Sequence, residues 1–217
     1  TERFFRDQAQ RLARQAAGED GWVLGDIGPT SRFVAPLGTD SFADFVAVFT
    51  EQAEALVAGG VDGIIVETMT ALDEARAALE AAKSVTDLPV AVTMTFMPDR
   101  SGAGFHTVMG VSVEEAVTTL QQAGADLVGS NCGVGSEAMV SVVKRMAAVA
   151  AVPLLAKPNA GLPRLEGGRT VYDESAQRFA QNGVALAQAG AAVIGGCCGT
   201  TPEHIRALTL AVSALRK

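Results

Sequence analysis

Short apolar segments alternate with longer amphipathic segments along most of this chain of 217 residues. The apolar segments predict strands at residues 22–28, 62–68, 89–96, 126–132, 152–158 and 191–198. The amphipathic segments predict helices at residues 1–17, 41–59, 71–85, 112–123, 136–149, 173–189 and 202–215. Because each apolar segment is almost continuously hydrophobic, we expect strands that are covered on both faces.

Several predicted helices have recognisable ends. Ser112 is followed three residues later by Glu115, which is the spacing of a capping box, and Thr201 precedes Pro202 at the start of the last helix. Gly124, just ahead of a predicted strand, is the residue that a left-handed helix cap favours. These boundaries support a chain built of consecutive strand–helix units.

Strand–helix alternation repeated in this way implies a parallel sheet, which is either an open doubly wound sheet or a barrel. Polar or reactive side chains stand at the carboxyl ends of most predicted strands, namely Asp26, Glu67, Thr95, Asn131, Cys132, Asn159, Cys197 and Cys198. Barrels build their sites from a ring of strand ends, whereas open sheets use one crevice. We therefore expect an α/β fold of the (βα)8 TIM-barrel type, with only six βα units in this chain and the first two missing.

Composition narrows the classes of partner. The chain has 24 acidic and 17 basic residues, a formal net charge of −7 and 48% hydrophobic residues. Such a sequence is neither disordered nor suited to a nucleic-acid backbone or an anionic membrane surface. It contains no apolar stretch long enough to span a membrane and no signal-peptide pattern, and its three cysteines do not make a secreted disulfide framework. We expect a cytoplasmic protein with reduced thiols that binds neither nucleic acid nor membrane.

The three cysteines are the strongest candidates for chemistry. Cys132 ends one predicted strand, and the vicinal pair Cys197 and Cys198 ends another between glycines. Cysteine is also a small hydrophobic residue that is often buried, and adjacent strand residues point to opposite faces unless the strand ends or bulges. Where the strand does end, three thiolates can hold zinc tetrahedrally and leave one position open, as catalytic zinc sites do.

Several segments together resemble the zinc-dependent homocysteine S-methyltransferases: Gly-Gly-Cys-Cys-Gly-Thr-Thr-Pro at 195–202, Asn-Cys at 131–132, Pro-Asn-Ala-Gly at 158–161 and Val-Glu-Thr at 66–68. This family includes the homocysteine-binding domain of cobalamin-dependent methionine synthase, the betaine–homocysteine methyltransferases and the S-methylmethionine enzymes. The likeness runs along essentially the whole chain. The segments at 28–32 and 159–163 are most similar to the methionine synthase branch.

The resemblance implies a zinc-dependent methyltransferase with a (βα)8 barrel. It implies that zinc is held by the thiolates of Cys132, Cys197 and Cys198. The thiol of homocysteine, or of a related small thiol, would take the fourth position and would be methylated, giving methionine from homocysteine. The resemblance assigns the ammonium group of the substrate to Glu67, and it makes Asn131 and Asn159 expected polar contacts of the substrate.

The resemblance leaves the methyl donor open among methylcobalamin, betaine and S-methylmethionine, and methylcobalamin would have to be held on another domain or protein. The chain also has no match to the family's opening strand, with its Asp-Gly-Ala-Met-Gly-Thr-like segment, or to the strand–helix unit after it. We therefore expect residues 1–217 to form an N-terminally incomplete barrel domain, with a partner or oligomer covering the open edge. The alternative is a truncated or non-catalytic barrel module that a partner chain completes.

Other residues carry less specific signals. Asp26 ends the first predicted strand and is a candidate substrate contact, although the glycines around it also suit a tight turn. His106 is expected to face solvent and His204 to be structural, while Lys157 either lies near the site or pairs with a carboxylate. The run from 133 to 138 has the G-x-G-x-x-A spacing of a dinucleotide site, but no acidic residue stands about twenty positions further on. An NAD-binding oxidoreductase is therefore less favoured.

Overall fold

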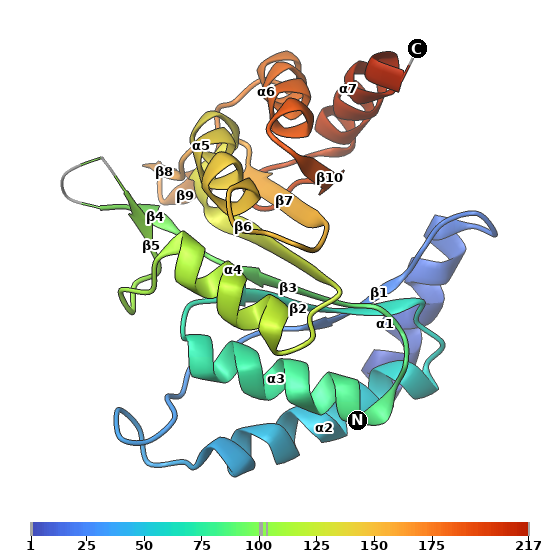
Figure 1. Cartoon of the computed structure of the whole chain (residues 1–217). Coiled ribbons are helices and arrows are strands. Elements are labelled where there is room, and N and C mark those ends of the chain that lie inside the picture. The colour runs from blue at the N-terminus through green and yellow to red at the C-terminus, as the bar shows by residue number, and fades with distance from the viewer. Residues whose placement is uncertain (1, 100–101, 103, 217) are drawn as a thin grey trace.

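Six parallel strands form the central sheet of the computed structural model, which describes residues 2–99, 102 and 104–216 (Figure 1). The strands are β1 (Leu24–Ile27), β2 (Gly63–Met69), β3 (Val90–Met94), β6 (Leu127–Gly135), β7 (Leu154–Asn159) and β10 (Ala191–Ile194). Their order in the sheet is their order in the sequence. A doubly wound sheet would reverse this order partway, so the arrangement is that of a barrel wall. The expected α/β fold with six βα units is confirmed.

A helix follows each of these strands and packs on the outer face of the sheet (Figure 1). The helices are α2 (Phe42–Ala58), α3 (Leu72–Val85), α4 (Val113–Gln122), α5 (Ser136–Ala147), α6 (Ala176–Gln188) and α7 (Pro202–Ser213), and the 3-10 turn η1 (Ala214–Arg216) follows the last. Ser112 caps α4 by accepting a hydrogen bond from the N–H of Glu115, as predicted. Within the described part of the chain, no helix has the length and hydrophobicity needed to cross a membrane.

The hydrophobic core lies between the strands and this outer layer of helices. Alternate strand residues point outward, and Ile64 and Val92 are fully buried in that layer. The residues between them point into the barrel interior, where a second, much smaller cluster contains Ile65, Ala91 and Leu155. The period of two therefore assigns each strand residue either to the helix-facing layer or to the interior.

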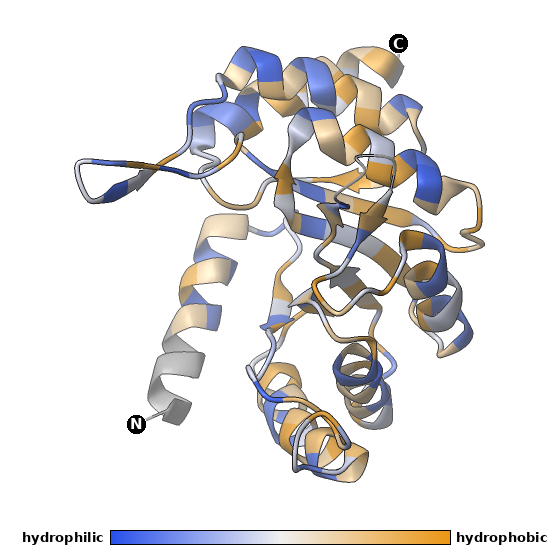
Figure 2. Cartoon of the chain, turned by 90° about the vertical axis from the view of Figure 1, so that its left-hand side faces the viewer, coloured by the Kyte–Doolittle hydropathy of each residue, from blue (hydrophilic) through white to orange (hydrophobic). Residues whose placement is uncertain are grey.

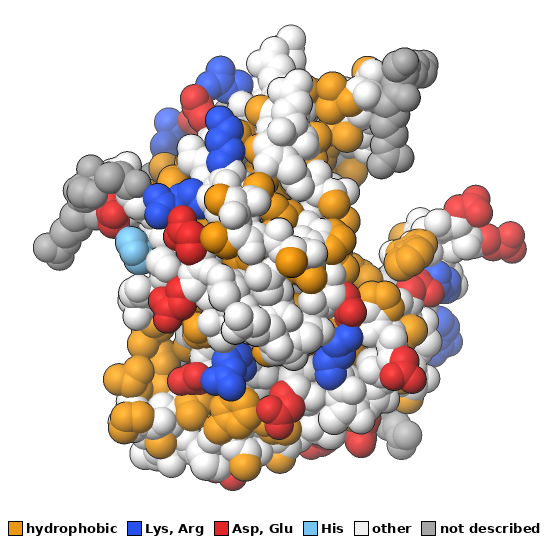
Figure 3. Space-filling view, viewed as in Figure 1, with side chains coloured by type: hydrophobic (Ala, Val, Ile, Leu, Met, Phe, Trp, Pro, Cys, Tyr) orange, Lys and Arg blue, Asp and Glu red, His pale blue; other side chains and the backbone are white. Residues whose placement is uncertain are grey.

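The two edge strands do not fit the prediction of burial on both faces. β1 and β10 are not hydrogen-bonded to each other, and the side chains of Leu24 and Val193 on these strands are 43% and 44% exposed. The prediction is wrong there because an interior-facing residue at an edge lacks the neighbouring strand that would cover it. Leu210 of α7 is exposed as well. Hydrophobic side chains reach the surface near α7 (Figure 3).

The predicted opening helix, α1 (Glu2–Ala17), stands apart from the outer layer of helices (Figure 2). The side chain of Gln10 donates to the carbonyl of Leu56 at 3.0 Å, and Arg14 pairs with Asp62 at 2.6 Å. These contacts tie α1 to the end of α2 and to the residues that lead into β2. α1 is therefore attached on the side of the sheet opposite to the carboxyl ends of the strands.

Two short hairpins that the sequence analysis did not predict follow the strands. β4 (Met97–Pro98) pairs with β5 (Phe105–His106) after β3, and β8 (Arg164–Glu166) pairs with β9 (Arg169–Val171) after β7. Both hairpins therefore stand at the carboxyl edge of the sheet. Two strand ends also differ from the prediction: β6 continues to Gly135, which pairs with Asn159, and β10 stops at Ile194.

Candidate metal and substrate site

The three cysteines meet at the carboxyl edge of the sheet. Cys132 lies near the end of β6, and Cys197 and Cys198 lie in the loop between β10 and α7. All three sulfur atoms lie within 4.8 Å of one another, and those of Cys132 and Cys198 are 3.7 Å apart. The vicinal pair can serve one site because the strand ends before it, as the sequence analysis required.

Local backbone geometry directs the sulfurs toward one another. Cys132 has a φ of 58° and Gly133 a φ of 67°, a left-handed conformation that is uncommon for residues other than glycine. The N–H of Cys197 donates to a carbonyl of β7 at 2.8 Å. The N–H of Cys198 donates to Oδ1 of the buried Asn159 at 3.1 Å. Asn159, a predicted substrate contact, is thus observed holding the loop of the vicinal cysteines.

The arrangement of the sulfurs fits a zinc ion. Zinc–sulfur bonds of about 2.3 Å at tetrahedral angles separate two sulfur atoms by about 3.8 Å, which is close to the 3.7 Å between Cys132 and Cys198. Among the described residues, these cysteines form the one cluster of three or more potential metal-ligating side chains. Three thiolates leave a tetrahedral ion one position for a further ligand.

The electrostatics of the cluster favour a bound cation. Burial raises the pKa of the Cys197 thiol to about 11. The hydrogen bond from Asn131 lowers this pKa, whereas the charges of the Cys132 and Cys198 thiolates raise it. Three thiols at these distances therefore oppose one another's ionisation, and a divalent cation would remove that opposition.

Tyr172 belongs to the same neighbourhood. Its hydroxyl has a raised pKa because of burial, then because of a hydrogen bond with Cys198 and the charges of the three cysteines. Its side chain packs against Gly199, where an added Cβ would lie 2.3 Å from the ring. Tyr172 was not predicted from the sequence, because it follows an unpredicted hairpin and belongs to no recognisable motif.

Asn131 is the buried centre of a polar network beside the cysteines. Its Nδ2 donates to the hydroxyl of Thr68 at 2.7 Å, and it lies 3.3 Å from Oε1 of Glu67 and 3.6 Å from the sulfur of Cys197. Its Oδ1 accepts from the N–H of Thr68 at 2.9 Å and from the hydroxyl of Thr93 at 2.7 Å. Thr68 has a φ of 65°, which is unusual for a β-branched residue, and Asn131 holds it in that conformation.

Glu67 faces the barrel interior and forms an ion pair with Lys157 of β7. Nζ of Lys157 lies 2.5 Å from Oε2 of Glu67. Asp26 of β1 lies within electrostatic reach of both: partial burial raises its pKa, the Glu67 carboxylate raises it further, and Lys157 lowers it. The structure thus brings two predicted carboxylates into one neighbourhood, and it places Lys157, whose role the sequence left undecided, with them.

A second polar network holds α5, α6 and α7 beside the cysteine cluster. The carboxylate of Glu174 accepts from the hydroxyl of Ser136 and from Asn182. Nε2 of the buried His204 lies 2.8 Å from the carbonyl oxygen of Glu174, and its ring packs edge-on against Phe179. His204 is therefore structural, as expected. Because the Glu174 carboxylate accepts from the N–H and the hydroxyl of Ser136, the first residue of α5, the G-x-G-x-x-A run does not present a vacant helix terminus to a phosphate.

A cavity of ≈ 690 Å³ lies between β4, β5, the end of β6, the first turns of α5, the loop after β7 and Arg178 of α6. Gly133, the neighbour of Cys132, is part of its wall. Much of the remaining wall is apolar, including Met97, Phe105, Val134 and Leu162. None of the three cysteines lines this cavity, which therefore borders the cysteine cluster only through Gly133.

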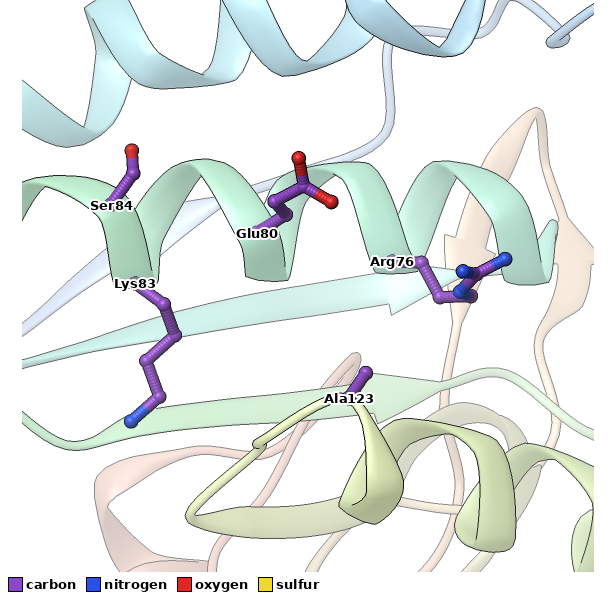
Figure 4. A pocket seen from close by; sticks show the side chains of 5 residues that line it. All are labelled: Arg76, Glu80, Lys83, Ser84 and Ala123. Carbon is purple, nitrogen blue, oxygen red and sulfur yellow. The ribbon is translucent and has the colours of Figure 1, made fainter.

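A second groove, of ≈ 430 Å³, lies on the outer helical layer between α3 and the end of α4 (Figure 4). Arg76, Glu80 and Lys83 project from α3 around it. Both cations already have protein partners, because Lys83 pairs with Asp126 at 2.6 Å and Arg76 with Asp73 at 3.4 Å. This groove is therefore not part of the site at the strand ends.

Comparison with known protein families identifies the family of this chain. The homocysteine S-methyltransferase family matches residues 2–212. The chain belongs to this family. The family resemblance inferred from the cysteine, asparagine and glutamate segments is confirmed.

Among members of the homocysteine S-methyltransferase family, the chain is similar to two mycobacterial proteins. It is 32% identical over 231 residues to methionine synthase of Mycobacterium tuberculosis (strain ATCC 25618 / H37Rv), with 98% of this chain and 19% of that protein covered. It is 32% identical over 227 residues to methionine synthase of Mycobacterium leprae (strain TN), with 96% and 18% covered. The chain thus spans about a fifth of the length of these relatives.

Solved structures show the same fold. The apo form of the homocysteine methyltransferase MmuM from Escherichia coli superposes with a TM-score of 0.75 at 23% identity, covering 97% of this chain and 73% of that one. The metallated form of the same protein gives a TM-score of 0.75 at 23% identity, covering 96% and 70%. The barrel-type arrangement of this chain is therefore that of an established family fold.

Proposed function

We propose that this chain takes part in methyl transfer to the thiol of homocysteine, forming methionine, with zinc held by Cys132, Cys197 and Cys198. The observation that carries the proposal is the convergence of three sulfur atoms within 4.8 Å at the carboxyl edge of the sheet, in a member of this family. A zinc ion bound there would keep the substrate thiol deprotonated at neutral pH.

The residues around the sulfurs supply what the reaction requires. Three thiolates around a dication leave a net charge of −1, so electron density stays on a substrate sulfur and favours its attack on an electrophilic methyl group. The sulfur–carbon bond forms as the bond from carbon to the donor breaks, and the leaving group takes the electron pair. Asn131, which lies 3.6 Å from the sulfur of Cys197, fixes that ligand relative to Glu67.

The substrate contacts extend from the metal ligands toward the barrel interior. Glu67 is proposed to bind the ammonium group of homocysteine, and Asp26 lies close enough to share that positive charge. Asn131 and Asn159 border the same region, and their observed hydrogen bonds order Thr68 and Cys198 around it. The proposed substrate site thus lies between the cysteine cluster and the interior carboxylates.

The methyl donor is proposed to reach the cysteine cluster from the carboxyl edge of the sheet, where the three sulfur atoms lie. Methylcobalamin, betaine and S-methylmethionine are the candidate classes, and methylcobalamin would be carried on another domain or protein. The similarity to two methionine synthases supports a place in methionine formation without choosing among these donors. The free thiols are compatible with a reduced, cytoplasmic setting.

The open edges of the sheet support the related proposal that the barrel is completed by further βα structure. β1 and β10 are each paired on one side only, and Leu24 on β1 and Val193 on β10 are exposed. A partner or a second copy that covers these edges would turn the wall into a closed barrel. The alternative function, a non-catalytic module that needs such a partner, rests on the same observation.

Zinc-edge X-ray absorption with and without L-homocysteine tests the proposal. We expect three sulfur ligands in the zinc-loaded chain and four after L-homocysteine is added, because the substrate thiol fills the remaining position. L-Methionine, whose thioether is a poorer ligand, should add none. Cys197→Ser should leave two sulfurs before substrate is added.

Two results would count against the proposal. Three sulfurs that stay at three with L-homocysteine would favour the non-catalytic module over the methyltransferase. A chain that takes up no zinc, or that binds it without sulfur, would overturn the metal assignment and the function built on it.

A further inference from the structure

The parallel sheet carries three charged side chains, and all three belong to one neighbourhood. Within its described strands, Asp26 and Glu67 are the acidic residues and Lys157 is the basic one. The period of two places each of them on the interior side, because Glu67 follows the interior residue Ile65 by two positions and Lys157 follows Leu155 by two. A lysine in the wall of a barrel requires an explanation, because burying an ammonium group is costly.

The pair of Glu67 and Lys157 is too enclosed to be an ordinary surface ion pair. The two side chains are 16% and 26% exposed, and Nζ lies 2.5 Å from Oε2. Enclosed ion pairs often add little stability, because desolvation offsets their attraction. The stability of the barrel therefore does not explain why a charged pair is kept here.

The position of the pair relative to the cysteines suggests what it does. Nδ2 of Asn131 contacts both Oε1 of Glu67 and the sulfur of Cys197, so the carboxylate and the proposed metal ligand converge on one nitrogen atom. Lys157 is directly paired with Asn131 in the register of β6 and β7. A thiol bound among the cysteines would therefore have both a carboxylate and an ammonium group close to the rest of its carbon chain.

We propose that Lys157 binds the α-carboxylate of the amino-acid thiol while Glu67 binds its α-ammonium group. The proposal rests on the proposed function and makes Lys157 a residue that determines specificity. In homocysteine two methylene groups separate the sulfur from the carbon that bears both charges, so the head group stays near the bound sulfur. The ammonium of Lys157 has three N–H donors and Glu67 has several acceptor positions, so each can bind the substrate and keep its partner.

Binding calorimetry on the zinc-loaded full chain separates this role from a structural one. The probes are L-homocysteine and 3-aminopropane-1-thiol, which is homocysteine without the carboxylate. We expect the native chain to bind L-homocysteine more tightly than 3-aminopropane-1-thiol. Lys157→Met should weaken L-homocysteine binding by about tenfold, which is the loss of one charge-assisted contact, and should leave the aminothiol within about twofold. Lys157→Arg should keep most of the preference for L-homocysteine over the aminothiol.

The controls distinguish the outcomes. Lys83→Met, which removes a lysine paired with Asp126 on the outer layer, should change neither affinity. Equal weakening of both thiols by Lys157→Met, or by Lys157→Gln if the methionine variant does not fold, would make Lys157 structural and overturn the inference. A native chain that binds both thiols equally overturns it too, but leaves the proposed function standing. A zinc-loaded chain that binds neither thiol overturns both.

Discussion

At the residue scale, Asn131 connects more parts of the site than its small amide group would suggest. It is completely buried and its amide is hydrogen-bonded at both ends, so it orders Thr68, Thr93 and the sulfur of Cys197 together. A buried amide with this many partners cannot be replaced without leaving donors and acceptors unpaired. Asn131 therefore links the cysteine cluster to the charged residues of the barrel interior.

Asp26 permits a prediction about pH. Partial burial raises the pKa of Asp26 above its ordinary value. The Asp26 carboxylate is therefore protonated at a higher pH in the folded chain than in the unfolded chain. At pH values above the pKa of Asp26 in the folded chain, the ionised carboxylate lowers the free energy of unfolding. This loss of stability disappears as the pH falls toward the ordinary pKa of an aspartate. Asp26→Asn should therefore raise the free energy of unfolding at pH 7, by a small amount because solvent screens this carboxylate. Urea unfolding should show the gain shrinking as the pH is lowered.

Asp44 provides a control of opposite sign for this prediction. Hydrogen bonds from the side chain and backbone of Ser41 lower the pKa of Asp44, so its ionised form adds stability above the unfolded pKa, and that stability is lost as the pH falls. Asp44→Asn should therefore destabilise the chain at pH 7, with a smaller effect at lower pH. If both variants changed the stability in the same direction, the explanation from the two pKa shifts would be wrong.

At the element scale, the end of β6 fixes where Cys132 points. Gly133 has a φ of 67°, and an added Cβ would lie 2.4 Å from the carbonyl oxygen of Phe96. Gly133→Ala should lower the free energy of unfolding by about 2 kcal/mol and weaken zinc binding, because the backbone that holds Cys132 must move. Urea unfolding and competition with a zinc chelator measure the two effects.

Gly110 offers a matched control, because it also has a positive φ, of 85°, but has open space around it. Gly110→Ala should cost about 1 kcal/mol through backbone strain alone and should not affect zinc binding. Equal loss of zinc affinity in both variants would show that the lack of space beside Phe96 is not the reason why Gly133→Ala displaces Cys132.

The sequence predicted the elements better than their ends. The apolar runs, together with the helix caps between them, predicted the positions of all six strands of the sheet. They did so because burial of a parallel strand leaves a strong hydrophobic signal. The hairpins after β3 and β7 left no such signal, since their strands are two or three residues long. Tyr172 follows one of them, so its place beside Cys198 depends on a loop path that no periodic pattern encodes.

The side on which each site residue lies was more predictable than its contacts. Counting in twos from Ile65 and Leu155 places Glu67 and Lys157 on one face of the sheet. Their ion pair, however, joins strands β2 and β7, which are not neighbours in the sheet. It forms because the wall curves, and curvature is a property of the whole sheet rather than of either strand.

At the scale of the whole molecule, the open sheet predicts uneven protection of its backbone. Within the sheet, β3 and β6 are hydrogen-bonded on both sides, whereas β1 and β10 are each bonded on one side. Amide hydrogen exchange of the isolated chain should therefore be at least about tenfold faster in the edge strands than in β3 and β6. Mass spectrometry of the exchanged chain resolves these segments.

The dependence of this exchange on protein concentration shows what covers the edges. If a second copy pairs with β1 or β10, their protection should rise with concentration while that of β3 stays constant, because only the edges gain hydrogen bonds on association. If another partner completes the barrel, the edges should stay unprotected at every concentration of the chain alone. Protection equal to that of β3 at the lowest concentration would mean that the sheet closes on itself, contrary to the strand order observed.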